Sequence, residues 1–307
     1  MIPLLQKMLV FLVLMLVGYI GARRGMLGQD FARSASKLTL NVFLSATILQ
    51  SVTNNPPAMS GGDLAYALLV AFLVTLLGYL VAGVTVRLLP LNKEKAPLFE
   101  LLISVMNPMF IGVPVAEILL GSQGVFYIAL SNVFFNLMLF TYGVWRLKAG
   151  ERSKLRLKDI LSVPLLVTIL SVIIFALRLP CPDMIRGLLA TVSPATVPMS
   201  MVVIGASLGR VSLADAFREK SLYLVALFRL LVVPVLTWLL FLVLPADPVL
   251  RASMLIMSAC PSGVIISMLS IQYGRDYEYS SKGILLDTAL SMLTIPLMTW
   301  LLIGASF

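Results

Sequence analysis

The segment Asn107-Pro108-Met109-Phe110-Ile111-Gly112-Val113-Pro114 decides the fold. Two prolines and a glycine lie within a long apolar stretch, and proline removes a backbone donor and interrupts a helix. An unpaired backbone group facing lipid is costly, so such a break persists only where protein buries it or where it lines a cavity. The segment therefore predicts an interrupted membrane helix, whose freed backbone groups and helix ends can hold an ion. A structural kink is the alternative for a single break of this kind.

A second break, Cys260-Pro261-Ser262-Gly263, stands at the corresponding place in the other half of the chain. At an offset of 153 residues, Pro108 matches Pro261 and Gly121 matches Gly274. Two matched breaks favour a substrate site between two broken helices over two unrelated kinks. The candidate substrate contacts at the breaks are Asn107, Pro108, Gly112, Pro114, Pro261, Ser262 and Gly263.

The composition around the breaks is that of a membrane protein. Hydrophobic residues make up 60% of the 307 residues and charged residues 12%, against about 25% charged in soluble domains. A bilayer core requires about 20 apolar residues per helix. Ten apolar ranges meet this requirement: 3–21, 35–53, 63–88, 96–119, 123–146, 160–178, 187–208, 221–244, 249–272 and 281–304.

These ranges predict an all-α polytopic membrane protein of ten transmembrane helices. Each half of the chain, 1–150 and 151–307, holds five of them. Because five is odd, the second half enters the bilayer with the opposite orientation, which gives two inverted five-helix repeats. The breaks fall in the fourth and ninth helices, which are expected to cross.

The positive charges predict the orientation. With the N-terminus outside, eighteen Lys and Arg residues fall on the cytoplasmic side, and only Lys7, Arg178, Arg186 and Arg251 fall outside. The positive-inside rule therefore predicts that both termini lie on the non-cytoplasmic side. The same rule accounts for the net charge of +9, so no nucleic-acid partner is expected.

The chain contains no histidine and two cysteines, Cys181 and Cys260. Ser-His and Cys-His nucleophilic pairs and histidine metal sites are thereby excluded. One cysteine falls in an expected loop and the other in an apolar range, so a disulfide framework is not expected. The sequence predicts no enzyme, no metal site and no cofactor.

Four further polar residues lie inside expected spans. Asn132 and Asn136 share one face of the fifth span, where they could line a substrate cavity or only join helices by hydrogen bonds. Arg229 and Asp287 are intramembrane charges, which usually mark a pathway or a pair. We expect an ion pair between them, with Asp287 the candidate for proton coupling; a purely structural bridge is the alternative.

The spacing Asn-x-x-x-x-Gly-x-Pro at Asn107, Gly112 and Pro114 resembles the fourth-helix signature of the auxin efflux carrier family. The segments 261–266 and Tyr273-Gly274-Arg275-Asp276 resemble that family's ninth helix. The family includes plant auxin carriers and bacterial permeases for malonate, malate and similar acids, and the resemblance covers the whole chain.

The resemblance implies a helix-crossover fold shared with bile-acid sodium symporters. In chain order, the first, second, sixth and seventh spans would form a scaffold, often dimeric. The third to fifth and eighth to tenth spans would form a mobile transport domain. The substrate carboxylate would lie near the crossing, with Asn107 as the foremost side-chain contact.

The sequence departs from the family pattern in three places. Ile265 and Ile266 stand where relatives carry a polar residue or a second proline, and Ser45 stands where many carry proline. The third span lacks the Asp/Lys pair found near the site of the plant carriers. The long central loop of many plant members is also missing, which favours a bacterial permease.

Together these features predict a secondary transporter of small organic anions that works by elevator-like alternating access within the lipid bilayer. Two alternatives stay open: a sodium-coupled carrier of the bile-acid type, and a membrane-embedded ligand sensor without net transport. The sequence leaves undecided the substrate, the direction of transport, a proton or sodium as coupling ion, and a homodimer through the scaffold helices.

Overall fold

The computed structural model describes residues 2–28, 30–53, 60–148, 163–209 and 212–303. Every regular element named in this part of the chain is helical, apart from one isolated bridge between two residues. The all-α prediction is therefore confirmed for the described residues. The predicted boundary between the two halves of the chain, at 150/151, lies outside them.

The chain divides into two compact units, each assembled from separate stretches of sequence. Unit 1 comprises Met1–Ala71, Met109–Val133 and Leu161–Arg210. Unit 2 comprises Phe72–Pro108, Phe134–Ile160 and Val211–Phe307. The two divisions at 71/72 and 133/134 fall inside long helices, and neither unit coincides with one half of the chain.

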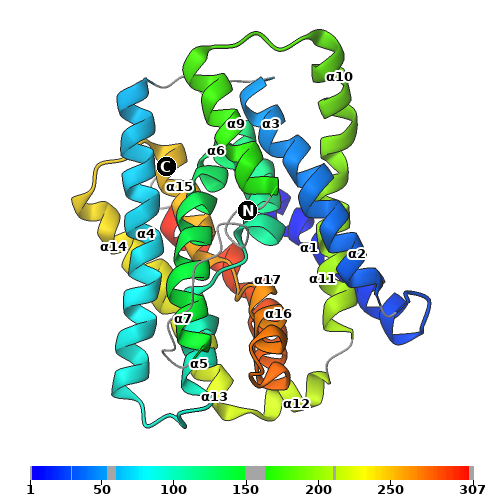
Figure 1. Cartoon of the computed structure of the whole chain (residues 1–307), viewed down its shortest axis with the longest axis vertical. Helices are drawn as coiled ribbons and strands as arrows, with labels where there is room; N and C mark the ends of the chain where they lie inside the picture. Colours follow the sequence, from blue (N-terminus) through cyan, green and yellow to red (C-terminus); the bar gives the residue numbers. More distant parts are fainter. Residues whose placement is uncertain (1, 29, 54–59, 149–162, 210–211, 304–307) are drawn as a thin grey trace. The chain divides into compact units, whose positions relative to one another are not determined.

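Unit 1 is built around a close contact between two helices from opposite halves of the chain, α1 and α11 (Figure 1). Its helices are α1 (Ile2–Arg23), α2 (Phe31–Leu38), the π-helix η1 (Thr39–Leu44), α3 (Ser45–Thr53), α9 (Val163–Leu177), α10 (Asp183–Val192), the 3₁₀ turn η4 (Ser193–Ala195) and α11 (Thr196–Leu208). It also takes in the first part of α4 and most of α6.

Glycine permits the approach of α1 to α11. A Cβ atom on Gly205 would lie 1.9 Å from the carbonyl oxygen of Met15, and one on Gly18 would lie 2.1 Å from that of Val202. Real Cβ atoms do not come so close, so the two backbones can touch only where side chains are absent. Small residues at helix contacts are the usual means of close packing in membranes.

Buried hydroxyl groups join α3 to the α10–α11 segment within unit 1. The side-chain oxygens of Thr47 and Thr196 lie 2.7 Å apart, and both residues are buried. Ser193 donates to the side-chain oxygen of Gln50. Such interhelical hydrogen bonds add to packing where lipid supplies no hydrophobic driving force between helices.

Unit 2 holds the remaining helices, with α13 against α5 and α16 against α17 (Figure 1). They are α4 (Gly61–Leu88), α5 (Ala96–Ser104), η2 (Pro108–Gly112), α6 (Val113–Met138), η3 (Leu139–Gly143), α7 (Val144–Leu147), α12 (Leu213–Arg218), α13 (Lys220–Leu227), η5 (Phe228–Val232), α14 (Val233–Val243), α15 (Pro248–Ala259), α16 (Ile265–Gln272), α17 (Tyr277–Met298) and η6 (Thr299–Ile303). Of these, α4 begins in unit 1, and most of η2 and α6 belongs to unit 1.

Side-chain caps determine where two site-bearing helices of unit 2 begin. Asp247 accepts hydrogen bonds from the backbone N–H groups of Val249 and Leu250 at 3.0 Å, and Pro248 occupies the first turn of α15. Asp276 accepts from the N–H of Tyr279 at 2.8 Å, at the start of α17. These caps satisfy helix-end donors that would otherwise be unpaired.

Several helices are apolar enough to cross a membrane. In the described residues, five continuous helical segments meet the length and hydropathy of a span: Gly61–Leu88, Pro108–Leu147, Asp183–Leu208, Lys220–Val243 and Tyr277–Leu301. Shorter apolar helices are Leu9–Arg23, Val163–Leu177 and Pro248–Ala259. Helix falls on each of the ten expected apolar ranges, whereas the number of crossings and their inverted arrangement stay predictions.

Candidate functional site

Two helix interruptions are present in unit 2, the first at residues 105–107, at the start of the predicted segment, whose remainder from Pro108 onward is helical. Helix α5 ends at Ser104, and Val105 follows in an extended conformation with φ −93° and ψ 103°. Helix α15 ends at Ala259, and Cys260 follows with φ −63° and ψ 145°. Cys260 directly precedes a proline, whose ring disfavours helical geometry in the preceding residue. Local chemistry therefore ends α15 where the sequence predicted.

The two breaks lie against each other and share backbone hydrogen bonds. Met106 and Ser262 form an antiparallel bridge. On either side of it, the N–H of Asn107 donates to the carbonyl of Pro261 at 2.9 Å, and the N–H of Gly263 donates to that of Val105 at 2.8 Å. The structure thus brings together two segments more than 150 residues apart in sequence.

Gly263 is required for this pairing. A Cβ atom at this position would lie 2.8 Å from the carbonyl oxygen of Met106 and 3.3 Å from the Val105 side chain. Both neighbours are fully or almost fully buried, so neither can easily move away. The Pro-x-Gly pattern of the second break therefore has a steric reason.

A single arginine caps the ends of both broken helices. Arg229 Nη1 donates to the carbonyl of Ile103 at 2.9 Å, near the end of α5. Its Nε donates to the carbonyl of Cys260 at 2.9 Å, and Nη2 donates to that of Ser258, at the end of α15. Arg229 has no exposed surface. Carbonyls at a helix C-terminus lack helical partners and carry partial negative charge, so a buried cation is stabilised there.

The expected direct ion pair between Arg229 and Asp287 is not among the ion pairs formed in the described part of the chain. The guanidinium group is directed instead at three carbonyl oxygens, which occupy its Nε and both Nη atoms. The two charged residues nevertheless belong to one cluster. Arg229 donates a hydrogen bond to the carbonyl of Cys260, and Asp287 is hydrogen-bonded to Ser262, two residues after Cys260. A functional pairing between them stays a prediction.

Asp287 reaches the second break through Ser262. The Ser262 hydroxyl forms a hydrogen bond with Asp287 Oδ2 and also lies 2.6 Å from the carbonyl oxygen of Leu102. Both side chains are fully buried. The other carboxyl oxygen, Oδ1, is buried with no hydrogen-bond partner among the described residues. A carboxyl group thus lies within the hydrogen-bonded junction of the two breaks.

The remaining predicted site residues are divided between the units. Asn107 and Asn136 lie in unit 2 and are 5% and 6% exposed, and Pro108 begins η2 directly after Asn107. Gly112, Pro114 and Asn132 belong to unit 1. The structure therefore brings together the residues of the two breaks with Arg229 and Asp287, and it does not relate the three in unit 1 to them.

A buried charge cluster that the sequence analysis did not single out lies elsewhere in unit 2. Glu100 on α5 is 1% exposed and pairs with Arg146 on α7, with Nη2 at 2.5 Å and Nε at 2.6 Å from Oε2. Tyr142 donates its hydroxyl to Oε1, and its ring packs edge-on against Tyr79. No local sequence pattern joins residues 46 positions apart. The one available signal was the presence of a carboxylate inside an apolar range.

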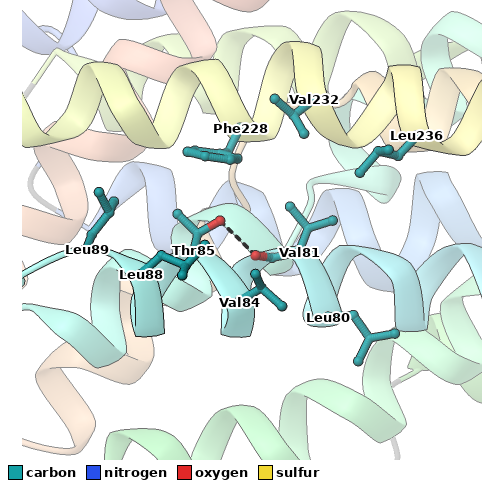
Figure 2. A pocket seen from close by; sticks show the side chains of 9 residues that line it. All are labelled: Leu80, Val81, Val84, Thr85, Leu88, Leu89, Phe228, Val232 and Leu236. Carbon is teal, nitrogen blue, oxygen red and sulfur yellow. Dashed lines mark hydrogen bonds between the residues drawn. The ribbon is translucent and has the colours of Figure 1, made fainter.

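A cavity of about 470 Å³ in unit 2 is unsuited to an anion (Figure 2). It lies between the end of α4 and the η5–α14 segment, and its lining residues are Leu80, Val81, Val84, Thr85, Leu88, Leu89, Phe228, Val232 and Leu236. Thr85 is the sole polar residue of this lining, and its hydroxyl donates to the carbonyl of Val81 at 2.7 Å. The junction of the breaks is therefore the better candidate for a polar ligand.

Apolar helices, two interrupted helices and buried charges at their junction define an integral membrane protein. The model of the Membrane transport protein family matches residues 3–156 and 151–299, so the chain belongs to this family. This match confirms the resemblance to auxin efflux carriers that the motifs indicated. The family is one of membrane transporters and not of enzymes.

Two archaeal relatives align over nearly their full length. An uncharacterized transporter of Methanocaldococcus jannaschii is 29% identical over 315 residues, covering 99% of this chain and 100% of the relative. An uncharacterized transporter of Methanothermobacter thermautotrophicus is 27% identical over 299 residues, covering 95% and 96%. Both relatives are described as transporters, which agrees with the family.

Proposed function

We propose that this protein is a secondary active transporter of small organic anions, with its substrate site at the junction of the two breaks. One observation carries the proposal: two broken helices meet through backbone hydrogen bonds, and one buried arginine caps both. A transporter must hold an ion away from water and then release it. Backbone groups at helix breaks, together with a buried cation, can bind an anion reversibly inside the membrane.

The carboxylate class of substrate is supported by charge and by resemblance. Arg229 supplies a buried positive charge beside the breaks, which favours an anion electrostatically, while its Nε and Nη atoms donate to backbone carbonyls. Asn107 carries both an amide donor and an acceptor, and its backbone forms part of the pairing between the breaks. Pro108, Asn136, Pro261, Ser262 and Gly263 complete the proposed substrate-binding set in unit 2. Gly112, Pro114 and Asn132 stay candidates on the sequence motifs alone.

We further propose ten spans in two inverted repeats, with movement of one bundle against the other. The division into two compact units supports this proposal. Unit 1 includes the expected first, second, sixth and seventh spans, and unit 2 includes the eighth to tenth. Residues 109–133 belong to unit 1 and not to the unit that holds α5, so the boundary of the moving part would lie within the fourth and fifth spans.

The proposed setting is a bacterial-type inner membrane, with both termini on the non-cytoplasmic side and a homodimer formed through the scaffold helices. The charge distribution supports the orientation. A cysteine introduced into the Asn92 loop, after replacement of both native cysteines by serine, would test it in intact cells. A membrane-impermeant maleimide should not reach that loop before permeabilisation.

The deciding experiment is uptake of radiolabelled mono- and dicarboxylates into proteoliposomes, with pH, sodium and voltage gradients imposed one at a time. We expect saturable uptake by the wild type and its loss in Asn107→Ala. The matched control is Asn92→Ala, which removes an exposed amide that accepts only a local hydrogen bond from the N–H of Glu94.

The other outcomes separate the alternatives. Uptake driven only by sodium would favour the bile-acid type of carrier. Saturable binding without flux under every gradient would favour a sensor. Uptake that is equally fast in Asn107→Ala and Asn92→Ala would remove Asn107 from the site.

A further inference from the structure

The Ser262 hydroxyl lies between two hydrogen-bond acceptors. Its oxygen is 2.6 Å from the carbonyl oxygen of Leu102 and also within hydrogen-bond distance of Asp287 Oδ2. A serine hydroxyl carries one hydrogen and can donate to one acceptor at a time. If Asp287 were ionised, one of these two contacts would bring lone pairs together without a hydrogen between them.

A proton on Asp287 removes this conflict. The carboxylic acid then donates from Oδ2 to Ser262 Oγ, and the hydroxyl donates onward to Leu102. We infer that Asp287, held by Ser262 at the junction of the broken helices, is the binding site of one exchangeable proton. The reaction is transfer of a proton from the carboxylic acid to water, which leaves a carboxylate and changes no oxidation state.

The surroundings of Asp287 contain few other charges. Arg229 on η5 belongs to the same hydrogen-bonded cluster through Cys260, which lies two residues before Ser262 and whose thiol donates to the carbonyl of Ile256. Glu100 on α5 is engaged by Arg146 and Tyr142. The described residues of α16 and η6 carry no ionisable side chain.

Other charged groups occur on the helices that pack against α17. They lie near the N-terminal part of α17, or at positions on their own helices other than those next to the breaks. Lys95 lies over the ring of Tyr279, and Glu219 accepts from Ser221, which contacts the Tyr279 hydroxyl. Tyr279 precedes Asp287 by eight residues, about 12 Å along a helix. Arg251 is near the start of α15, and the remaining charged or phenolic groups of α12 and α13 are Asp215, Arg218, Lys220 and Tyr223.

The proton site gives a reason for coupling, which rests on the proposed function. With Asp287 protonated, Arg229 leaves one net positive charge in the buried cluster, and a carboxylate can neutralise it. With Asp287 ionised, the cluster is neutral and loses its net attraction for a carboxylate. Anion binding should therefore be tight at low pH and weaken, by at most about tenfold per pH unit, once Asp287 releases its proton.

Infrared spectroscopy of the purified protein in lipid nanodiscs tests the proton site without any substrate. We expect the carbonyl band of a buried carboxylic acid in the wild type, its loss as pH rises, and its absence in Asp287→Asn. In Ser262→Ala the band should change frequency because its hydrogen-bond partner is gone. Ser270→Ala, which removes a buried hydroxyl bonded only to the carbonyl of Ile266 on its own helix, should leave the band in place.

Identical difference spectra for the wild type and Asp287→Asn over the pH range in which both stay folded would overturn the inference. The link to anions is tested by counterflow of radiolabelled malonate and acetate at several pH values. Counterflow by Asp287→Asn should not depend on pH, whatever its rate. A pH dependence equal to that of the wild type would refute the link between the proton on Asp287 and anion binding. Absence of counterflow in the wild type would instead refute the proposed function, while the infrared band would still decide the proton site.

Discussion

Arg229 Nη1 donates to the carbonyl oxygen of Ile103 at 2.9 Å, across 126 residues of sequence. The same side chain donates to the carbonyl oxygens of Ser258 and Cys260, so the C-terminal ends of α5 and α15 are both capped by one guanidinium group. Its planar group with several N–H donors can serve helix ends that approach from different directions, which no other side chain does equally well.

Replacing this arginine should therefore destabilise the protein. Arg229→Met would leave the carbonyl groups of Ile103, Ser258 and Cys260 without this donor, and a buried unpaired polar group costs about 1–3 kcal/mol. We expect a marked fall in the melting temperature in nanodiscs. The melting temperature of Arg229→Lys should lie between those of Arg229→Met and the wild type, because an ammonium group donates hydrogen bonds but lacks the planar arrangement of guanidinium. A melting temperature for Arg229→Met equal to that of the wild type would contradict the capping role.

The pairing of the two breaks should be sensitive to a single methyl group. In Gly263→Ala the new Cβ atom would lie 2.8 Å from the carbonyl oxygen of Met106. Overpacking of this kind typically costs about 1–3 kcal/mol. We expect a lower melting temperature and impaired uptake in proteoliposomes. Gly28→Ala, where nothing lies within 4 Å of the added atom, is the control and should behave as the wild type.

The contact of α1 with α11 should tolerate no side chain at Gly205. In Gly205→Val, the Cβ atom would coincide with space held by the backbone of Met15. The helices would have to separate, and we expect misfolding that is visible as aggregation in size-exclusion chromatography. Gly187→Val on α10 is the matched control, because its added Cβ atom meets nothing within 4 Å. A monodisperse, thermally stable Gly205→Val protein would show that the close approach is dispensable.

Glu100, which is 1% exposed, and Arg146, whose side chain is 25% exposed, should show strong coupling in a double-mutant cycle. Removing one partner of a buried ion pair costs about 3–5 kcal/mol, because the other charge is left uncompensated. We expect Glu100→Gln and Arg146→Met each to lower stability strongly, and the double variant to lose less than the sum. The melting temperature in nanodiscs is measured for the wild type, both single variants and the double variant.

An exposed pair supplies the comparison for that cycle. Lys282 and Glu278 form an ion pair at 2.6 Å, and the Glu278 side chain is 72% exposed. Exposed pairs contribute at most about 1 kcal/mol, so Glu278→Gln should change the melting temperature little. Strictly additive effects of the Glu100 and Arg146 substitutions would show that their contact contributes nothing.

The helical class and the positions of both breaks could be predicted from the sequence, because they follow from local chemistry. Apolar ranges of sufficient length form helices in lipid, since every backbone group must be paired internally. Pro261 disfavours helical geometry at Cys260, directly after α15, and Pro108 has no N–H to donate to Ser104, where α5 ends. The Asn-x-x-x-x-Gly-x-Pro motif also led to the family.

Only the tertiary structure decided the partners of the buried charges. Arg229 was expected to pair with Asp287 because each is a charge in an apolar range, yet its partners are backbone carbonyls. Every residue has a carbonyl group, so no sequence pattern distinguishes the three that lack helical partners and face Arg229. Likewise, Ser262 beside Asp287 and Glu100 beside Arg146 depend on how distant helices pack. Local interruptions are properties of the chain, whereas the choice of partner for a desolvated charge is a property of the assembled fold.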